Sequence, residues 1–169
     1  MNTTDSMTDK LDIVMATEDD LPLILDFIRN LAEYERMRDM CVASIETLRA
    51  TLFTSPSAAE VIIARLHGKP VGFALFFHNY STFLAQRGIF LEDLYVNPEG
   101  RGKGVGRALL AKLAELAIER DCGRLEWVVL NWNDLAIGFY KSIGAEQMNE
   151  WSTFRITGVS LTELASDAR

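Results

Sequence analysis

The sequence has 169 residues, which fits a single domain and leaves no room for a second. Hydrophobic residues make up 49% and charged residues 24%, a globular composition that excludes a disordered chain. Lys and Arg total 17 against 24 Asp and Glu, and the net charge of −7 argues against nucleic acid as a partner, because phosphate binding needs a basic face. An acidic protein is better matched to a cationic ligand.

No apolar run approaches the roughly 20 residues that span a membrane, so we expect no membrane partner. Residues 1–10 are polar and predict a flexible arm rather than a secretory signal, followed by one domain over 11–169. Cys41 and Cys122 lack metal-ligand spacing and there are only two histidines, so no metal site is expected. This cysteine usage predicts a reduced, cytoplasmic protein.

Periodicity and turn residues predict the secondary structure along the chain. The expected strands are 11–15, 60–66, 71–80, 89–96, 124–130 and 153–157, and the expected helices are 21–36, 44–53, 105–120 and 135–143. Thr17 with Asp20 is typical of a helix start, and Ser44 is expected to cap the second helix. Three successive strands in the middle exclude a simple alternating parallel sheet. We therefore expect an α/β (α+β) fold: a mixed, mostly antiparallel sheet with helices on both faces.

The most informative segment is Arg101-Gly-Lys-Gly-Val-Gly-Arg107, between an expected strand and an expected helix. Three alternating glycines leave backbone N–H groups free to converge on an anion, and the helix adds its positive N-terminal end. Arg101, Lys103 and Arg107 add charge-assisted contacts. A nucleotide P-loop needs Lys-Ser/Thr after its last glycine, and a dinucleotide fingerprint needs G-x-G-x-x-G. The spacing here, G-x-G-x-G, fits neither.

The remaining pattern, Arg/Gln-x-x-Gly-x-Gly, resembles the pyrophosphate loop of the GNAT acyltransferases, and the resemblance extends over about residues 12–157. Five blocks are similar to the spermidine/spermine N-acetyltransferase branch: Leu31-Ala-Glu-Tyr-Glu35, Tyr80-Ser-Thr-Phe83, Leu91-Glu-Asp-Leu-Tyr-Val96, Trp132-Asn133 and Phe139-Tyr-Lys-Ser-Ile-Gly-Ala145. The resemblance implies a GNAT fold with splayed strands at the acyl-CoA site. It implies an acetyl-CoA-dependent N-acetyltransferase in which the primary amine of a small cationic acceptor, a polyamine or a lysine- or thialysine-like compound, attacks directly.

By this resemblance the acetyl-CoA site draws on one strand, the glycine loop and the last expected helix. Its residues are Leu94, Tyr95, Val96, Arg101, Gly102, Lys103, Gly104, Val105, Gly106, Arg107, Asn133, Asp134, Leu135, Ala136 and Tyr140. One N–H group of residues 94–96 would stabilise the oxyanion of the reaction. Tyr140 would protonate or hydrogen-bond the departing thiolate; the alternative is a packed core tyrosine.

Glu92 and Asp93 are adjacent carboxylates inside an apolar strand. Because burying a charged group is costly, their presence there indicates a specific role. We expect Glu92 to face the amine pocket and accept a proton, directly or through water; the alternative is a partnered structural carboxylate. The implied acceptor-binding residues are Tyr34, Glu35, Glu92, Glu126, Trp127 and Val128. The three glutamates would form an acidic slot, and Tyr34 and Trp127 would offer cation–π faces.

Near residues 149–151 the chain is shorter than the polyamine enzymes and lacks room for one of their acidic contacts, a departure that counts against spermidine as the acceptor. A protein amine remains an alternative acceptor, and a non-catalytic acyl-CoA sensor an alternative function. The resemblance also implies a homodimer whose surface includes residues 151–156.

Overall fold

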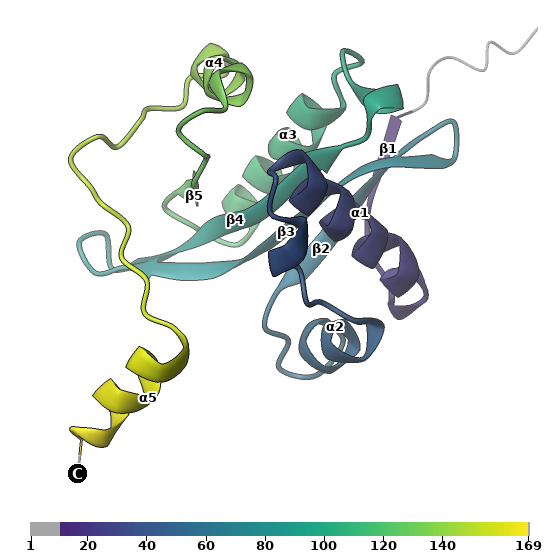
Figure 1. Ribbon diagram of the computed structural model, residues 1–169. Coiled ribbons are helices and arrows are strands. Elements are labelled where there is room, and N and C mark those ends of the chain that lie inside the picture. Colours follow the sequence, from purple (N-terminus) through teal and green to yellow (C-terminus); the bar gives the residue numbers. More distant parts are fainter. Residues whose placement is uncertain (1–10, 169) are drawn as a thin grey trace, which may run out of the picture. The chain divides into compact units, whose positions relative to one another are not determined.

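The computed structural model describes residues 11–168, which form two compact units, one ending at Val128 and one beginning at Val129 (Figure 1). The expected arm, residues 1–10, lies outside the described residues. The strands are β1 (Leu11–Met15), β2 (Glu60–Leu66), β3 (Lys69–Ser81), β4 (Gln86–Val96) and β5 (Leu125–Trp127). The α-helices are α1 (Leu21–Tyr34), α2 (Ile45–Leu52), α3 (Val105–Glu119), α4 (Asp134–Ser142) and α5 (Gly158–Ser166); short 3₁₀ turns cover Glu18–Asp20, Arg38–Met40 and Pro98–Gly100.

The first unit is built on one five-stranded sheet in the order β1-β2-β3-β4-β5. Neighbouring strands from β1 to β4 are antiparallel, and β5 joins the edge of β4 in parallel. The expectation of a mixed, mostly antiparallel sheet is therefore confirmed. No helix among residues 11–168 is both long and apolar enough to cross a membrane.

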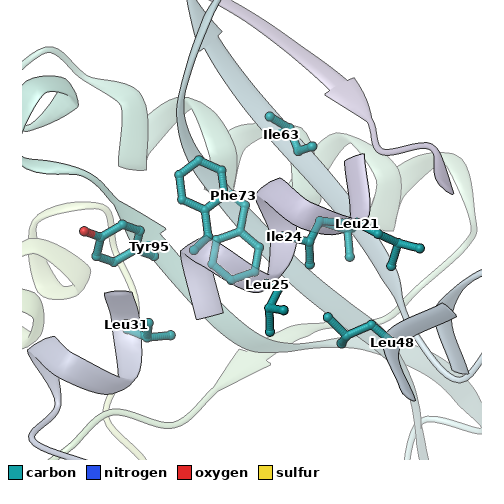
Figure 2. Close-up of a cluster of buried hydrophobic side chains, with 10 residues drawn as sticks. Leu21, Ile24, Leu25, Leu31, Leu48, Ile63, Phe73 and Tyr95 are labelled. Carbon is teal, nitrogen blue, oxygen red and sulfur yellow. The ribbon is translucent and has the colours of Figure 1, made fainter. Parts of the chain in front are cut away.

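One face of the sheet is covered by α1 and α2. Residues of both helices are buried together with Val61 and Ile63 of β2, Phe73 of β3 and Tyr95 of β4 (Figure 2). The Phe27 ring of α1 stacks on Phe73, with 5.3 Å between centroids, and lies 6.0 Å from the Tyr95 ring. This apolar cluster fixes α1 against the middle of the sheet, because the aromatic rings bury the largest apolar surfaces.

The other face is covered by α3. The buried positions of β2 alternate, so Ile62 and Ala64 turn away from the α1 cluster, and α3 contributes a stripe of buried leucines that begins at Leu109. Arg120, at the C-terminal end of α3, makes a bidentate ion pair with Glu60 of β2 and lies 5.7 Å above the Phe76 ring. Helices on both faces, as expected from the sequence, are confirmed.

Local signals account for the helix ends. The Ser44 hydroxyl accepts a hydrogen bond from the Thr47 N–H at 3.2 Å and caps α2 as expected. Thr17 and Asp20 form the expected reciprocal box, although it starts a 3₁₀ turn that runs directly into α1. Gly144, at φ +90°, follows the last turn of α4 and ends it.

Two expectations about the C-terminal part of the sequence are wrong. The strand expected over 124–130 is limited to Leu125–Trp127, and residues 153–157 form no strand. Alternating side chains suit a strand, but a strand also needs a neighbour that takes up its backbone hydrogen bonds, and 153–157 has none within residues 11–168. Helix α5, which follows directly, was not expected; its apolar side chains are exposed.

Candidate active site

Strand β4 changes its pairing halfway along its length. On its β3 side the register skips Glu92, because Leu91 lies opposite Phe76 and Asp93 lies opposite Leu75. Glu92 is therefore the extra residue of a β-bulge. On its other side, β4 pairs with β5 only over the three residues before the bulge. Beyond it, this edge of β4 has no partner strand among residues 11–168, which is the splayed edge expected at an acyl-CoA site.

The three residues expected to line the cofactor arm lie on this edge segment, but their side chains differ. Tyr95 is buried in the apolar cluster with α1, so only its backbone is available to a ligand. Leu94 and Val96 are half-buried. The segment thus offers backbone groups and two aliphatic side chains, which suit an amide-containing, largely apolar arm.

The glycine loop follows β4 and ends at the first residue of α3. Asn97 accepts a hydrogen bond from the Gly100 N–H at 3.0 Å and holds the turn. Gly102 and Gly104 have φ of +71° and +77°, a conformation that glycine adopts without steric cost. A Cβ atom added to either would meet no atom within 4 Å, so the space in front of the loop is open.

The donors around this space fit a diphosphate. Helix α3 begins at Val105, and the N–H groups of its first turn have no partner within the helix. Lys103 and Arg107 are exposed beside the bare glycine backbone. Backbone N–H groups, a helix N-terminus and basic side chains together make an anion cradle. The structure therefore brings the residues expected to bind diphosphate, 101–107, into one cradle at the end of β4.

Arg101, the first residue of the loop, contacts residues from two other elements. Its Nε donates a hydrogen bond to the Val96 carbonyl at 3.1 Å, and its guanidinium lies 5.3 Å from the centroid of the Tyr34 ring. Tyr34 is the last residue of α1 and was expected to contact the acceptor. In the structure its ring lies against Arg101 of the glycine loop.

A pocket of about 310 Å³ lies between the end of α1, the segment that follows it, and β4. Its lining is mostly apolar, with two carboxylates: Ile28, Leu31, Ala32, Glu35, Met37, Met40, Cys41, Val42, Ala43 and Asp93. Arg36 adopts a left-handed φ of +61°, which turns the chain back at the end of α1. The Met37 N–H donates to the Ala32 carbonyl at 2.8 Å, so residues 37–43 are held against α1 as a wall.

The two carboxyl groups of the pocket are electrostatically unusual. Burial, together with the smaller effect of the nearby charges of Glu92 and Glu35, raises the pKa of Asp93 to about 6. Burial also raises the pKa of Glu35. Carboxylates in an apolar setting are well suited to receive a cation, because the cation offsets the cost of burying their charge. Of the expected acidic slot, Glu35 lines this pocket and Glu92 lies beside it, at the bulge.

The third member of the expected slot has partners elsewhere. Glu126 of β5 forms an ion pair with Arg124 at 2.8 Å and accepts a hydrogen bond from the Asn79 amide of β3, also at 2.8 Å. The Asn79 contact joins β5 to β3 across β4, whereas the ion pair with Arg124 is local, since Arg124 directly precedes β5. Trp127 is half-buried and Val128 is exposed; neither lines the pocket.

The remaining expected site residues belong to the second unit. The Asn133 side chain accepts a hydrogen bond from the Ala136 N–H at 3.2 Å and caps α4. Asp134 and Leu135 are exposed in the first turn of α4. Tyr140 is half-buried two turns further along, with its ring 5.5 Å from that of Phe139.

The sequence did not single out Asp93 or the wall over residues 37–43. Asp93 was visible only as the neighbour of Glu92, and the signal that would have selected it, the bulge, depends on pairing with β3. No group of three or more His, Cys, Asp or Glu side chains within residues 11–168 is arranged to hold a metal ion.

The open strand edge, the glycine loop before α3 and the helices on both faces are the arrangement expected of an acyltransferase of the GNAT fold, and comparisons with known proteins agree. The family model "Acetyltransferase (GNAT) family" matches residues 27–145. This chain belongs to the acetyltransferase (GNAT) family, so the expectation of an acetyltransferase is confirmed.

Known relatives cover nearly the whole chain. Thialysine N-epsilon-acetyltransferase of Bos taurus is 39% identical over 161 residues, which cover 89% of this chain and 94% of the relative. Spermidine/spermine N(1)-acetyltransferase-like protein 1 of Homo sapiens is 30% identical, with 93% of this chain and 24% of the relative covered. The solved structure of the Vibrio cholerae integron cassette protein VCH_CASS6 matches with a TM-score of 0.78 and 31% identity, covering 92% of this chain and 97% of that one. The resemblance drawn from the sequence is thus confirmed.

The raised pKa of Asp93 predicts how stability depends on pH. The pKa of Asp93 is about 6 in the folded protein, against its ordinary value of 3.8, which applies to the unfolded chain. The folded protein therefore holds this proton more tightly than the unfolded chain does. The free energy of unfolding should therefore fall as the pH rises from about 4 to about 6 and stay low above that. Asp93→Asn should remove this fall and raise the free energy of unfolding at pH 7 by about 3 kcal/mol at most.

Urea denaturation at a series of pH values checks this. Asp39→Asn, at an exposed residue of the 3₁₀ turn Arg38–Met40, is the matched control and should keep the wild-type profile. An Asp93→Asn variant with an unchanged pH profile would contradict the electrostatic description of the pocket.

The glycine geometry predicts the behaviour of the cradle. Gly104→Val should weaken acetyl-CoA binding at least tenfold, because a side chain at φ +77° strains the loop and blocks the close approach of a diphosphate. Gly68→Val is a matched control: φ is +76°, a Cβ meets nothing within 4 Å, and the residue lies in the turn between β2 and β3. Both variants should lose similar stability, but calorimetry should show lost affinity only for Gly104→Val. Equal affinities in the two folded variants would contradict the assignment of the loop.

Proposed function

We propose that this chain transfers the acetyl group of acetyl-CoA to a terminal primary amine of a small cationic acceptor, and that a lysine- or thialysine-like acceptor is preferred to a polyamine. The observation that supports the proposal is the pocket in which Glu35 and Asp93 lie among apolar side chains beside the bulge of β4. Its volume of about 310 Å³ is at the small end of the range for ligand pockets. The charged groups of its lining are two carboxyl groups, those of Glu35 and Asp93. Both features favour one ammonium group on a short apolar stem over a long chain of several amines.

In this proposal the cradle and the strand edge hold acetyl-CoA, which supplies the acetyl group as a reactive thioester. Residues 101–107 bind the diphosphate through backbone N–H groups, with Arg101, Lys103 and Arg107 adding charge. Leu94 and Val96 contact the arm, and a backbone N–H of residues 94–96 polarises the acetyl carbonyl. Asn133, Asp134, Leu135 and Ala136 at the start of α4 complete the cofactor site, a role carried over from the family motif.

The proton leaves the acceptor through the acidic side of the pocket. Glu35 and Asp93 hold the acceptor ammonium, and Glu92 takes one proton from it, directly or through water, so that the free amine attacks. At the other end of the reaction, the Tyr140 hydroxyl gives its proton to the departing sulfur and regains one through solvent, as the nitrogen loses its second proton when the amide forms. Support for Glu92 is its place at the bulge, where the strand edge opens beside the pocket; support for Tyr140 is its position in the family motif on α4.

We further propose that residues 11–169 act as one domain, because the family match runs from residue 27 to 145 across both units. A cytoplasmic location is supported by both cysteines being free thiols, which suits a reducing compartment.

A panel of amines tests the acceptor class. We expect kcat/KM to be highest for thialysine or lysine, lower for spermidine, and at least tenfold lower for an alkyl monoamine of similar length. Glu35→Gln should raise KM for the diamines about tenfold, the scale of a lost charge-assisted contact. Glu33→Gln, at an exposed carboxylate two residues earlier on α1, is the control and should have no effect. Similar kcat/KM for all three amines, or highest activity on a lysine-containing peptide, would reject a small-diamine pocket.

The proposed proton roles separate kinetically. Tyr140→Phe keeps the ring and removes the proton donor, so kcat should fall about 100-fold while acetyl-CoA affinity is retained. Glu92→Gln removes a proton acceptor, so its defect should be largest at low pH and shrink as rising pH supplies free amine. Rate–pH profiles of both variants, each compared with wild type, provide the check. Near-wild-type kcat for Tyr140→Phe would make this residue a packed core tyrosine instead.

A homodimer is the proposed assembly, supported by the exposure of large apolar side chains in the expected contact segment. Trp151 is 72% exposed, Phe154 93% and Ile156 45%. Light scattering at micromolar concentration should give about twice the chain mass of 19.0 kDa, and Phe154→Asp should reduce it toward a single chain. A wild-type particle of one chain mass would reject the dimer.

A further inference from the structure

The contact between Tyr34 and Arg101 gives these two residues a shared task. Tyr34 closes α1 and precedes Glu35 of the acceptor pocket, whereas Arg101 opens the glycine loop. Their side chains meet, with the guanidinium 5.3 Å from the ring centroid. Guanidinium groups stack on aromatic faces through both charge and planar contact, which a lysine ammonium cannot reproduce.

A hydrogen bond from its Nε atom also restrains the same guanidinium. The Arg101 Nε donates to the Val96 carbonyl at 3.1 Å, at the end of β4. A guanidinium carries five N–H donors, and this bond uses one of them. The ring of Tyr34 and the carbonyl of Val96 therefore fix the plane and direction of the group, while its terminal nitrogens keep four donors for an anion.

We propose that Tyr34 is a positioning residue for the cofactor: its ring orients Arg101 so that the terminal guanidinium nitrogens bind the diphosphate of acetyl-CoA. The sequence favoured a different task, a cation–π contact with the acceptor amine. The structure supplies a cation from the chain itself for that ring. A long, flexible arginine that is held before the ligand arrives loses less conformational entropy on binding, so the ring strengthens acetyl-CoA binding without touching it. This inference rests on the proposed use of acetyl-CoA.

The consequence is that the end of α1 serves both sites. Glu35 faces the acceptor pocket, and its neighbour Tyr34 supports the diphosphate cradle across the end of β4. Cofactor and acceptor affinity should thus respond to different residues of the same helix turn: Glu35 for the acceptor and Tyr34 for acetyl-CoA.

Calorimetric titration with acetyl-CoA, without acceptor, tests the proposal. Tyr34→Leu should weaken binding about three- to tenfold, the affinity equivalent of a cation–π contact at a partly exposed site. Tyr34→Phe keeps the aromatic face and should bind as wild type. Tyr80→Leu makes the same change at an exposed tyrosine of β3 and should leave the affinity unchanged.

A double-mutant cycle measures the coupling between Tyr34 and Arg101 in acetyl-CoA affinity, and a purely structural role of Tyr34 would give no such coupling. Arg101→Ala should weaken binding, and adding Tyr34→Leu to it should weaken binding no further, because the ring then has nothing to orient. Additive losses, or wild-type affinity in Tyr34→Leu with a raised KM for the acceptor amine, would overturn the proposal. If wild-type protein itself binds no acetyl-CoA, the proposed function fails instead, so the two failures are distinguishable.

Discussion

The candidate site depends on the point along β4 at which one of its edges stops pairing with a neighbouring strand. A strand normally has both of its edges paired or covered, because unpaired N–H and carbonyl groups are costly to bury. Here β5 accompanies β4 for three residues and then leaves it, while β3 continues to the end of the strand. The open edge is backbone that a ligand with amide groups of its own can pair with. The pocket and the anion cradle both lie along this same strand.

The bulge at Glu92 decides which side chains reach which face of the sheet. Before it, Leu91 lies opposite Phe76, on the α3 side; after it, Asp93 and Tyr95 lie opposite Leu75 and Phe73, on the α1 side. Without the extra residue, strict alternation would put Leu91, Asp93 and Tyr95 on one face. The inserted residue thus lets the same strand contribute a core leucine to one layer and, two residues later, a carboxyl group to a pocket on the other.

Features that local sequence encodes were predictable, and features that need distant partners were not. The bounds of β2, the cap at Ser44 and the glycine loop before α3 follow from periodicity, side-chain hydrogen bonding and backbone freedom, all properties of a few consecutive residues. The bulge that turns Asp93 into the pocket depends on register with β3. The strand expected over 153–157 failed for the same reason: its pattern is correct, but no neighbour within residues 11–168 pairs with it.

The candidate site shows the same division at the level of single side chains. The sequence identifies candidate residues for binding an anion or a cation by their side-chain type: Arg101, Tyr34, Glu35 and Glu126. Which of them contact each other is a matter of three-dimensional arrangement. Glu126 is held by Arg124 and Asn79, and Tyr34 by Arg101.

The wall over residues 37–43 has a consequence for how such a protein can diversify. Met40 and Val42 are 72% and 89% exposed, and the wall is joined to α1 by hydrogen bonds from the Met37 N–H to the Ala32 carbonyl and from the Arg38 guanidinium to the Arg29 carbonyl. Substitutions at these two exposed positions alter the shape and polarity of the pocket, and neither residue belongs to the buried cluster around Phe73 or to the glycine loop. Under the proposed function, natural selection can therefore change the molecule that is modified while the donor of the group stays the same, because Met40 and Val42 line the pocket and take no part in the glycine loop.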